Sequence, residues 1–279
     1  GALAASGNVS KRRAAGLPLT GVTHVPYEGY LDGALDTIAY LEALVDDPAG
    51  GTDLPAAIVV ETVQGEGGLA SASAEWLRRL ERLARSRGIL LIVDDIQAGC
   101  GRTGGFFSFE EAGIKPDLVC MAKSISGYGL PMALTLIRPE LDVLEPGAHA
   151  GTFRGNNLAF VTATASLDFW ENAEFRERVS SLSREFGDRL ERWRDGFEHL
   201  GCRPLGRGMF RGLAFADEST AAEVSRAAFR RGLLLETSGA RSQVLKIMPP
   251  IVMDPGELHR CLDRVEDVLS EIDGPKGGN

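Results

Sequence analysis

Residues 89–95 read Ile-Leu-Leu-Ile-Val-Asp-Asp, five apolar residues that stop at two carboxylates. A continuous apolar run of this length predicts a strand buried on both faces of a parallel sheet. A glycine-rich polar segment follows, and a second apolar run, residues 118–122, ends at Lys123. Open α/β sheets bind ligands beyond the carboxyl ends of their strands, so Asp94 and Lys123 are predicted to mark a ligand site.

The chain before this strand predicts a βαβ unit. Residues 56–63 form another continuous apolar run, and residues 73–87 carry apolar residues at helical spacing, with Ser73 as the predicted N-cap. Gly88 separates this helix from the next strand. Strand, helix and strand in this order predict a mostly parallel sheet with helices on both faces, a three-layer α/β arrangement.

The rest of the chain divides into two parts at residue 200. By the same criteria, strands are predicted at 118–122, 133–137, 209–215, 233–236 and 244–247, and helices at 32–45, 158–171, 174–200, 220–231 and 255–272. Most of residues 1–35 lack such patterns and are predicted to be irregular. We expect an α/β large domain over residues 1–200 and a small α+β domain over residues 201–279.

Composition excludes several classes of function. Lys+Arg 30 against Asp+Glu 39 gives a net charge of -9 without a basic run, so no nucleic-acid partner is predicted. Four scattered cysteines show no metal-ligand spacing, which predicts reduced thiols, a cytoplasmic location and no metal site. Apolar runs stay below membrane-spanning length, so no membrane partner is predicted. The chain opens on Gly1 in mid-pattern, and we expect an N-terminal part to be missing.

Asp94 and Lys123 each allow an ordinary structural interpretation. An isolated aspartate at a strand end is usually a helix cap or a surface ion pair, and a lysine there is more often structural or contacts a phosphate. Lys123 follows a buried strand and precedes a Ser/Gly turn, so we expect partial desolvation that makes its amine a nucleophile. Together the two residues match the needs of pyridoxal phosphate (PLP), a Schiff-base lysine and an acid facing the pyridine nitrogen.

Four segments then resemble a known family. In chain order they are Gln64–Gly68, Asp94–Gly104, Lys123 and Gly151–Asn156. They are similar to the signatures of class III (subgroup II) aminotransferases, which are fold-type I PLP enzymes, and the resemblance covers essentially the whole chain. The segments from Asp94, Lys123 and Gly151 are most similar to the diaminobutyrate:2-oxoglutarate aminotransferases of ectoine and siderophore pathways.

The resemblance implies a reaction and leaves alternatives. It implies transfer of the terminal amino group of L-2,4-diaminobutyrate, or a similar ω-amino acid donor, to a 2-oxo-acid acceptor, 2-oxoglutarate. An aminomutase or racemase on the same scaffold is the alternative. A catalytically silent regulatory or scaffold chain is a third reading. The family's earlier segments, a glycine/serine-rich phosphate cradle and an aromatic–His pair, are missing from residues 1–279.

The resemblance also implies residue roles. Lys123 would carry the Schiff base and act as general base and acid. Asp94 would pair with the pyridinium nitrogen and Gln97 would contact the phenolic oxygen side of the ring. Thr152 would reach the cofactor phosphate of a neighbouring subunit, which implies a homodimer or a dimer of dimers. Ile96 would pack on the ring, although a plain core role suits it equally well.

Two further residues are implied to bind substrate. Glu66 corresponds to the glutamate that screens a carboxylate-binding arginine in ornithine and 4-aminobutyrate enzymes. Lys246 occupies the place of that arginine, and its alternative reading is a surface lysine at a strand end. Lysine offers a point charge without a bidentate fork, so acceptor binding is expected to differ. Weaker candidates for substrate contact are Arg154, Tyr128, Glu236 and Thr237.

Overall fold

Contacts divide the chain into two units. The computed structural model describes residues 1–127 and 129–273, so Tyr128 and the C-terminal residues 274–279 lie outside the described residues. Unit 1 comprises Gly1–Thr62, Ala72–Gln97 and Phe109–Leu167. Unit 2 comprises Val63–Ser71, Ala98–Ser108 and Asp168–Asn279.

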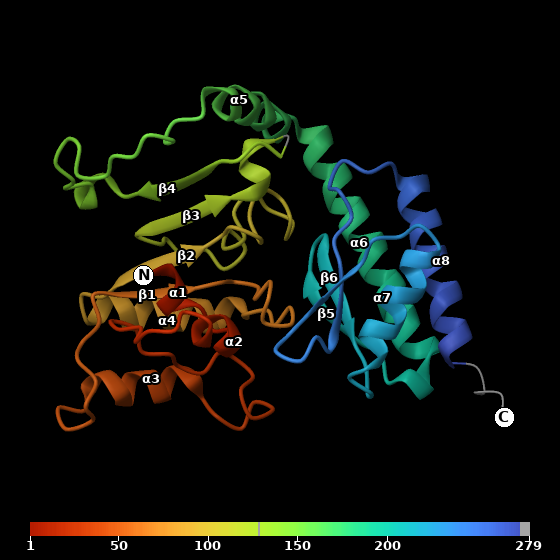
Figure 1. Cartoon of the computed structure of the whole chain (residues 1–279), viewed down its shortest axis with the longest axis horizontal. Helices are drawn as coiled ribbons and strands as arrows, with labels where there is room; N and C mark the ends of the chain where they lie inside the picture. Colours follow the sequence, from red (N-terminus) through yellow and green to blue (C-terminus); the bar gives the residue numbers. More distant parts are fainter. Residues whose placement is uncertain (128, 274–279) are drawn as a thin grey trace. The chain divides into compact units, whose positions relative to one another are not determined.

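Unit 1 is built on a four-stranded sheet in the order β1-β2-β3-β4 (Figure 1). The strands are β1 (Ala57–Val60), β2 (Leu90–Asp94), β3 (Leu118–Ala122) and β4 (Ala133–Ile137). β1, β2 and β3 are parallel, and β4 runs antiparallel to β3. Helix α4 (Ala74–Ser86) connects β1 to β2, which confirms the predicted βαβ unit and the α/β class.

Helix α4 forms where the sequence predicts it. The Ser73 side chain accepts a hydrogen bond from the Trp76 backbone at 3.1 Å, and so caps the helix. Its inward face is buried at Trp76, Leu77, Leu80, Leu83 and Ala84. This face belongs to the core of unit 1, which also takes in Ile38 and Leu41 of helix α3 (Thr37–Asp46).

The i,i+4 spacing of charges along α4 predicts two ion pairs, Glu81–Arg85 and Glu75–Arg79. Glu81 pairs with Arg85 at 2.9 Å, which confirms the first. The second prediction is wrong, because Arg79 instead reaches Asp36, the N-cap of α3, at 2.7 Å. A tertiary partner thus replaces the local one.

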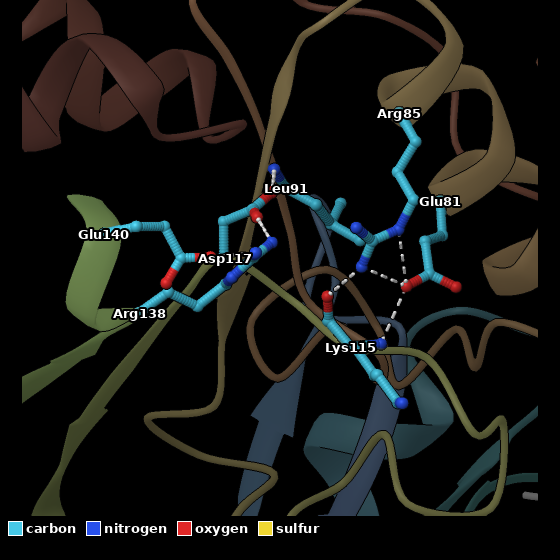
Figure 2. A network of polar contacts seen from close by, with 7 residues as sticks. All are labelled: Glu81, Arg85, Leu91, Lys115, Asp117, Arg138 and Glu140. Atoms are coloured by element: carbon cyan, nitrogen blue, oxygen red, sulfur yellow. Dashed lines mark hydrogen bonds and ion pairs between the residues drawn. The ribbon is translucent and has the colours of Figure 1, made fainter.

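A polar network fixes the amino ends of β2 and β3 (Figure 2). Asp117, immediately before β3 and only 8% exposed, accepts from the Leu91 backbone N–H at 2.8 Å and from the Arg138 guanidinium at 2.7 Å. Arg138 also pairs with Glu140. These contacts hold the strands in register from one edge, and the carboxyl ends lie at the other.

Unit 2 contains an antiparallel sheet in the order β5-β6-β8-β7. The strands are β5 (Arg203–Arg207), β6 (Phe210–Ala214), β7 (Glu236–Ser238) and β8 (Val244–Ile247), and the helices are α6 (Ala173–Gly196), α7 (Thr220–Arg230) and α8 (Pro255–Asp273). The core of unit 2 buries Phe186, Leu190 and Trp193 of α6 with residues of β6, β8, α7 and α8. Short strands with helices confirm an α+β unit.

The remaining elements show where the sequence expectations differ. They are α1 (Ala2–Ala5), α2 (Val9–Arg13), α5 (Asn157–Glu171) and the 3-10 turns η1 (Lys123–Ser126), η2 (Pro139–Leu141) and η3 (Glu198–Leu200). The short helices α1 and α2 occur in a segment predicted to be irregular. The sequence also missed β5 and placed β7 three residues early.

The division into units differs from the predicted domain boundary at residue 200. Helix α6 shares its core with the antiparallel sheet, so the last segment of unit 2 begins at Asp168. Among the described residues, every helix is too short or too polar to cross a membrane.

Candidate active site

The carboxyl ends of β2 and β3 bring Asp94 and Lys123 to one edge of the sheet. Asp94 is the last residue of β2 and lies opposite Cys120 in β3, three residues before Lys123. Burial, and after it the Asp94 charge, raise the pKa of the Cys120 thiol. The half-buried Asp94 carboxylate accepts from the Ile96 backbone N–H at 3.1 Å. The parallel register therefore places a carboxylate and an amine on adjacent strand ends.

Lys123 stands on a strained, closely packed turn. Its φ of 55° is in the left-handed region, which costs a non-glycine residue roughly 1–3 kcal/mol and is typical of functional positions. It begins η1, in which the Ser126 hydroxyl donates to the Lys123 carbonyl at 3.2 Å. At Gly127, φ is 75° and a Cβ would lie 2.8 Å from the Thr162 carbonyl oxygen. The turn thus fixes the lysine backbone.

The expected desolvation of Lys123 is wrong for this chain. Its side chain is exposed, although the neighbouring Met121 and Ile125 are buried. Lys123 has a φ of 55° at the point where the chain leaves β3, and the residue is exposed there. Lys123 therefore lies exposed at the carboxyl end of β3.

The residues after β2 continue the same edge. Asp95 is 1% exposed, and its backbone N–H donates to the Cys120 carbonyl at 2.9 Å. Ile96 and Gln97 follow and are both half-buried. The position of Gln97 next to the Asp94 strand end is compatible with contact to the same ligand.

Thr152 lies in an exposed loop of unit 1 before α5. The following residue, Phe153, is 99% exposed, and the Arg154 side chain is hydrogen-bonded to His149 at 3.0 Å. Within the chain, this loop presents Thr152 outward.

In unit 2 the structure joins Glu66 to Lys246 and adds Glu236. The Lys246 ammonium lies 3.0 Å from a carboxylate oxygen of Glu66 and 3.0 Å from one of Glu236. The Lys246 side chain is 3% exposed, whereas those of Glu66 and Glu236 are 69% and 68% exposed. The reading of Lys246 as a surface lysine is wrong, because all four residues of β8 are buried.

Burial and the two carboxylates act on Lys246 in opposite directions. Burial alone lowers the pKa of the Lys246 ammonium, since desolvation disfavours the charged form. The hydrogen bonds and charges of Glu236 and Glu66 outweigh burial, and the pKa lies above its ordinary value. Lys246 is therefore held as a cation.

The turn that carries Glu66 is fastened to the end of β7. The buried Ser238 hydroxyl donates to the Gly65 carbonyl at 2.8 Å and accepts from the Gly68 N–H at 3.1 Å. The Gly239 N–H donates to the Glu66 carbonyl at 3.1 Å. These bonds set where the Glu66 side chain begins, and so support its contact with Lys246.

Comparison with known proteins settles the family. Residues 1–269 match the family described as "Aminotransferase class-III". The chain belongs to the class III aminotransferases. It is 50% identical over 277 residues to the diaminobutyrate--2-oxoglutarate transaminase of Bordetella parapertussis, covering 97% of this chain and 64% of that protein. With the enzyme of the same name from Streptomyces coelicolor the identity is 51% over 276 residues, covering 97% and 64%.

Solved structures show the same fold. The ornithine aminotransferase from Toxoplasma gondii has a TM-score of 0.76 at 30% identity, covering 85% of this chain and 55% of that one. The acetylornithine aminotransferase from Elizabethkingia anophelis has a TM-score of 0.74 at 28% identity, covering 84% and 61%. The chain thus spans about two thirds, 64%, of the length of the curated relatives named above.

The residues of unit 1 fit the cofactor of this family. Class III aminotransferases depend on PLP, which needs an amine for its aldehyde and an acid for its ring nitrogen. An accessible lysine on a rigid turn and a carboxylate on the neighbouring strand end supply both groups. Among residues 1–127 and 129–273, no cluster of three or more His, Cys, Asp or Glu side chains could hold a metal ion.

Proposed function

We propose that the protein containing this chain transfers the terminal amino group of L-2,4-diaminobutyrate, or of a similar ω-amino acid, to 2-oxoglutarate with the help of PLP. The observation that carries the proposal is the register of β2 and β3, which brings Asp94 and Lys123 to one edge. The names of relatives about 50% identical support the choice of substrates.

Lys123 and Asp94 have complementary tasks in this proposal. When bound, PLP supplies an aldehyde that condenses with amines and a ring that withdraws electrons from the substrate carbon. Lys123 Nζ would bind the cofactor aldehyde, and as a free amine it would act as general base toward the substrate carbon and then as general acid toward the carbon of the former aldehyde. The Asp94 carboxylate holds a proton on the ring nitrogen, because an adjacent negative charge favours the cationic form.

Neighbouring residues position the ring and the phosphate. Gln97 would contact the phenolic oxygen side of the ring, and Ile96 would pack on a ring face. Thr152, on its exposed loop, contacts the cofactor phosphate of a second subunit, which makes the active unit a homodimer or a dimer of dimers. Unit 1 is then most of a cofactor-binding domain.

Substrate carboxylates are assigned to the Lys246 centre of unit 2. Lys246 attracts the carboxylate of the acceptor, and Glu66 screens this charge while the donor is bound. The relatives' names support a role in diaminobutyrate metabolism, and the proposal extends this role to ectoine synthesis. The four scattered cysteines favour a cytoplasmic location. Neither a nucleic acid nor a membrane partner belongs to the proposal.

The test is glutamate formation by the full-length protein from L-2,4-diaminobutyrate and 2-oxoglutarate with added PLP. Lys123→Ala is expected to abolish turnover. Lys115→Ala is the matched control, because Lys115 is also an exposed lysine of unit 1 but lies at the opposite edge of the sheet. Unchanged turnover in Lys123→Ala would refute the proposal. An aminomutase or racemase would convert the donor without 2-oxoglutarate and without forming glutamate.

A further inference from the structure

We propose that Glu236 is a specificity-determining residue, which together with Glu66 gives the Lys246 centre a net negative charge that favours a cationic diamino acid over a dicarboxylate. The inference rests on the proposed function and deepens it. It assigns the donor preference to Glu236, which was only a weaker candidate for substrate contact in the sequence.

The two glutamates reach Lys246 from different elements. Glu236 and Lys246 are directly paired residues of the antiparallel strands β7 and β8, so their side chains lie on the same face of the sheet. Glu66 comes from a turn outside the sheet, which the Ser238 hydroxyl and the Gly239 N–H hold in place. Withdrawal of the Glu66 side chain therefore leaves the Glu236 contact intact.

The charges at this centre do not cancel. One ammonium faces two carboxylates, and the charges of these three groups alone sum to -1 while both glutamates are in place. If Glu66 alone turns away to admit an acceptor, Glu236 still neutralises Lys246. If Lys246 had only one glutamate partner, withdrawal of that partner would leave the full positive charge of Lys246 unpaired. The second glutamate thus weakens the attraction of Lys246 for an anionic acceptor.

The geometry also favours an ammonium ligand. The Lys246 side chain is 97% buried and directs N–H donors at both glutamates. Both glutamate side chains are more than two-thirds exposed, so the centre faces solvent mainly through carboxylates. A diamino acid brings a second ammonium that carboxylates attract, and a monoamino acid donor does not.

The test compares Glu236→Gln with the wild type in the full-length protein. Glutamine keeps the shape and a hydrogen-bond acceptor for Lys246 but removes the charge. We expect KM for 2-oxoglutarate to fall roughly fivefold to tenfold and KM for L-2,4-diaminobutyrate to rise by a similar factor. This is the size of effect expected when one charge is removed at a partly exposed site. We expect kcat to stay within about twofold, since Glu236 touches no reacting atom.

Two variants serve as controls. Glu218→Gln removes an exposed carboxylate of the same unit that pairs with Arg241, and it is expected to leave both KM values unchanged. Glu236→Asp keeps the charge and is expected to retain the wild-type preference. Equal shifts in Glu218→Gln would show that only the overall charge matters and would overturn the assignment.

A binding measurement separates this inference from the proposed function. Calorimetry with glutarate, an unreactive dicarboxylate, is expected to show roughly fivefold to tenfold tighter binding to Glu236→Gln. If the wild type fails to convert diaminobutyrate but glutarate still binds more tightly to Glu236→Gln, the proposed function is refuted and the inference about Glu236 stands. Unchanged KM values and glutarate affinity, with a loss of thermal stability alone, would reduce Glu236 to a structural residue.

Discussion

Replacement of Asp117 by alanine tests whether the polar network at the amino ends of β2 and β3 maintains the register of the sheet. Asp117 accepts from the buried Leu91 N–H at 2.8 Å and from Arg138 at 2.7 Å (Figure 2). Loss of a hydrogen bond between a charged group and a buried amide costs about 1.5–3 kcal/mol. The Arg138 side chain is 41% exposed, so its ion pair adds only about 0–1 kcal/mol. Asp117→Ala is therefore expected to destabilise the protein by about 1.5–4 kcal/mol.

The assay is urea unfolding of the full-length protein, with the midpoint and slope measured for each variant. Glu140→Ala is the matched control, since it removes a carboxylate from the same Arg138 at an exposed position and is expected to change stability by less than about 0.5 kcal/mol. Asp117→Asn keeps a neutral acceptor for Leu91 and should lie between the two. Equal midpoints for Asp117→Ala and Glu140→Ala would refute the reasoning.

Three further predictions concern other parts of the two units. Gly127→Ala places a Cβ 2.8 Å from the Thr162 carbonyl oxygen at a φ of 75°, so it should destabilise the Lys123 turn. The visible absorbance of bound PLP should then fall, and unchanged absorbance would contradict this. The raised pKa of Lys246 means that its ion pairs contribute fully below pH 10.5 and lose their contribution as pH rises through the higher folded-state pKa. Urea midpoints should therefore fall by more above that pH in the wild type than in Lys246→Met, and equal falls would contradict this. Phe186→Ala removes a fully buried ring from the core of unit 2 and should cost about 3–5 kcal/mol in calorimetric or urea unfolding, and a cost below about 1 kcal/mol would show that the core tolerates the loss.

The parallel sheet was predictable because its signals are local. Continuous apolar runs mark β2 and β3, and Gly88 marks the end of α4. The carboxyl-edge rule then brings Asp94 and Lys123 together without knowledge of other contacts. The exposure of Lys123 was not predictable, because it depends on the left-handed backbone at the strand end.

The strands of unit 2 show why pattern reasoning failed there. β5 contains Pro204 and Gly206, which favour a loop in the sequence. In the structure, the φ of Gly206 is 76° and a Cβ there would lie 2.1 Å from the Phe210 carbonyl oxygen. The glycine therefore permits close approach within the β5–β6 hairpin. β7 is polar and its place is set by pairing with β8, so propensity pointed to the apolar residues before it.

The contact of Glu236 with Lys246 was also not predictable from local sequence patterns. This contact follows from the register of β7 against β8, which the predicted strand at residues 233–236 did not specify. Motif comparison supplied Glu66 and Lys246 but only a weak indication for Glu236. Tertiary pairing, rather than local pattern, assembles this part of the candidate site.

The most direct test of the account asks which lysine binds the cofactor. The full-length protein would be incubated with PLP, reduced with borohydride, digested and mapped by mass spectrometry. The account predicts a pyridoxyl group on Lys123, and it predicts loss of that label in Lys123→Ala but not in Lys115→Ala. Labelling of a different lysine in the wild type, or no labelling at all, would contradict the assignment of Lys123 and Asp94 as the centre of the site.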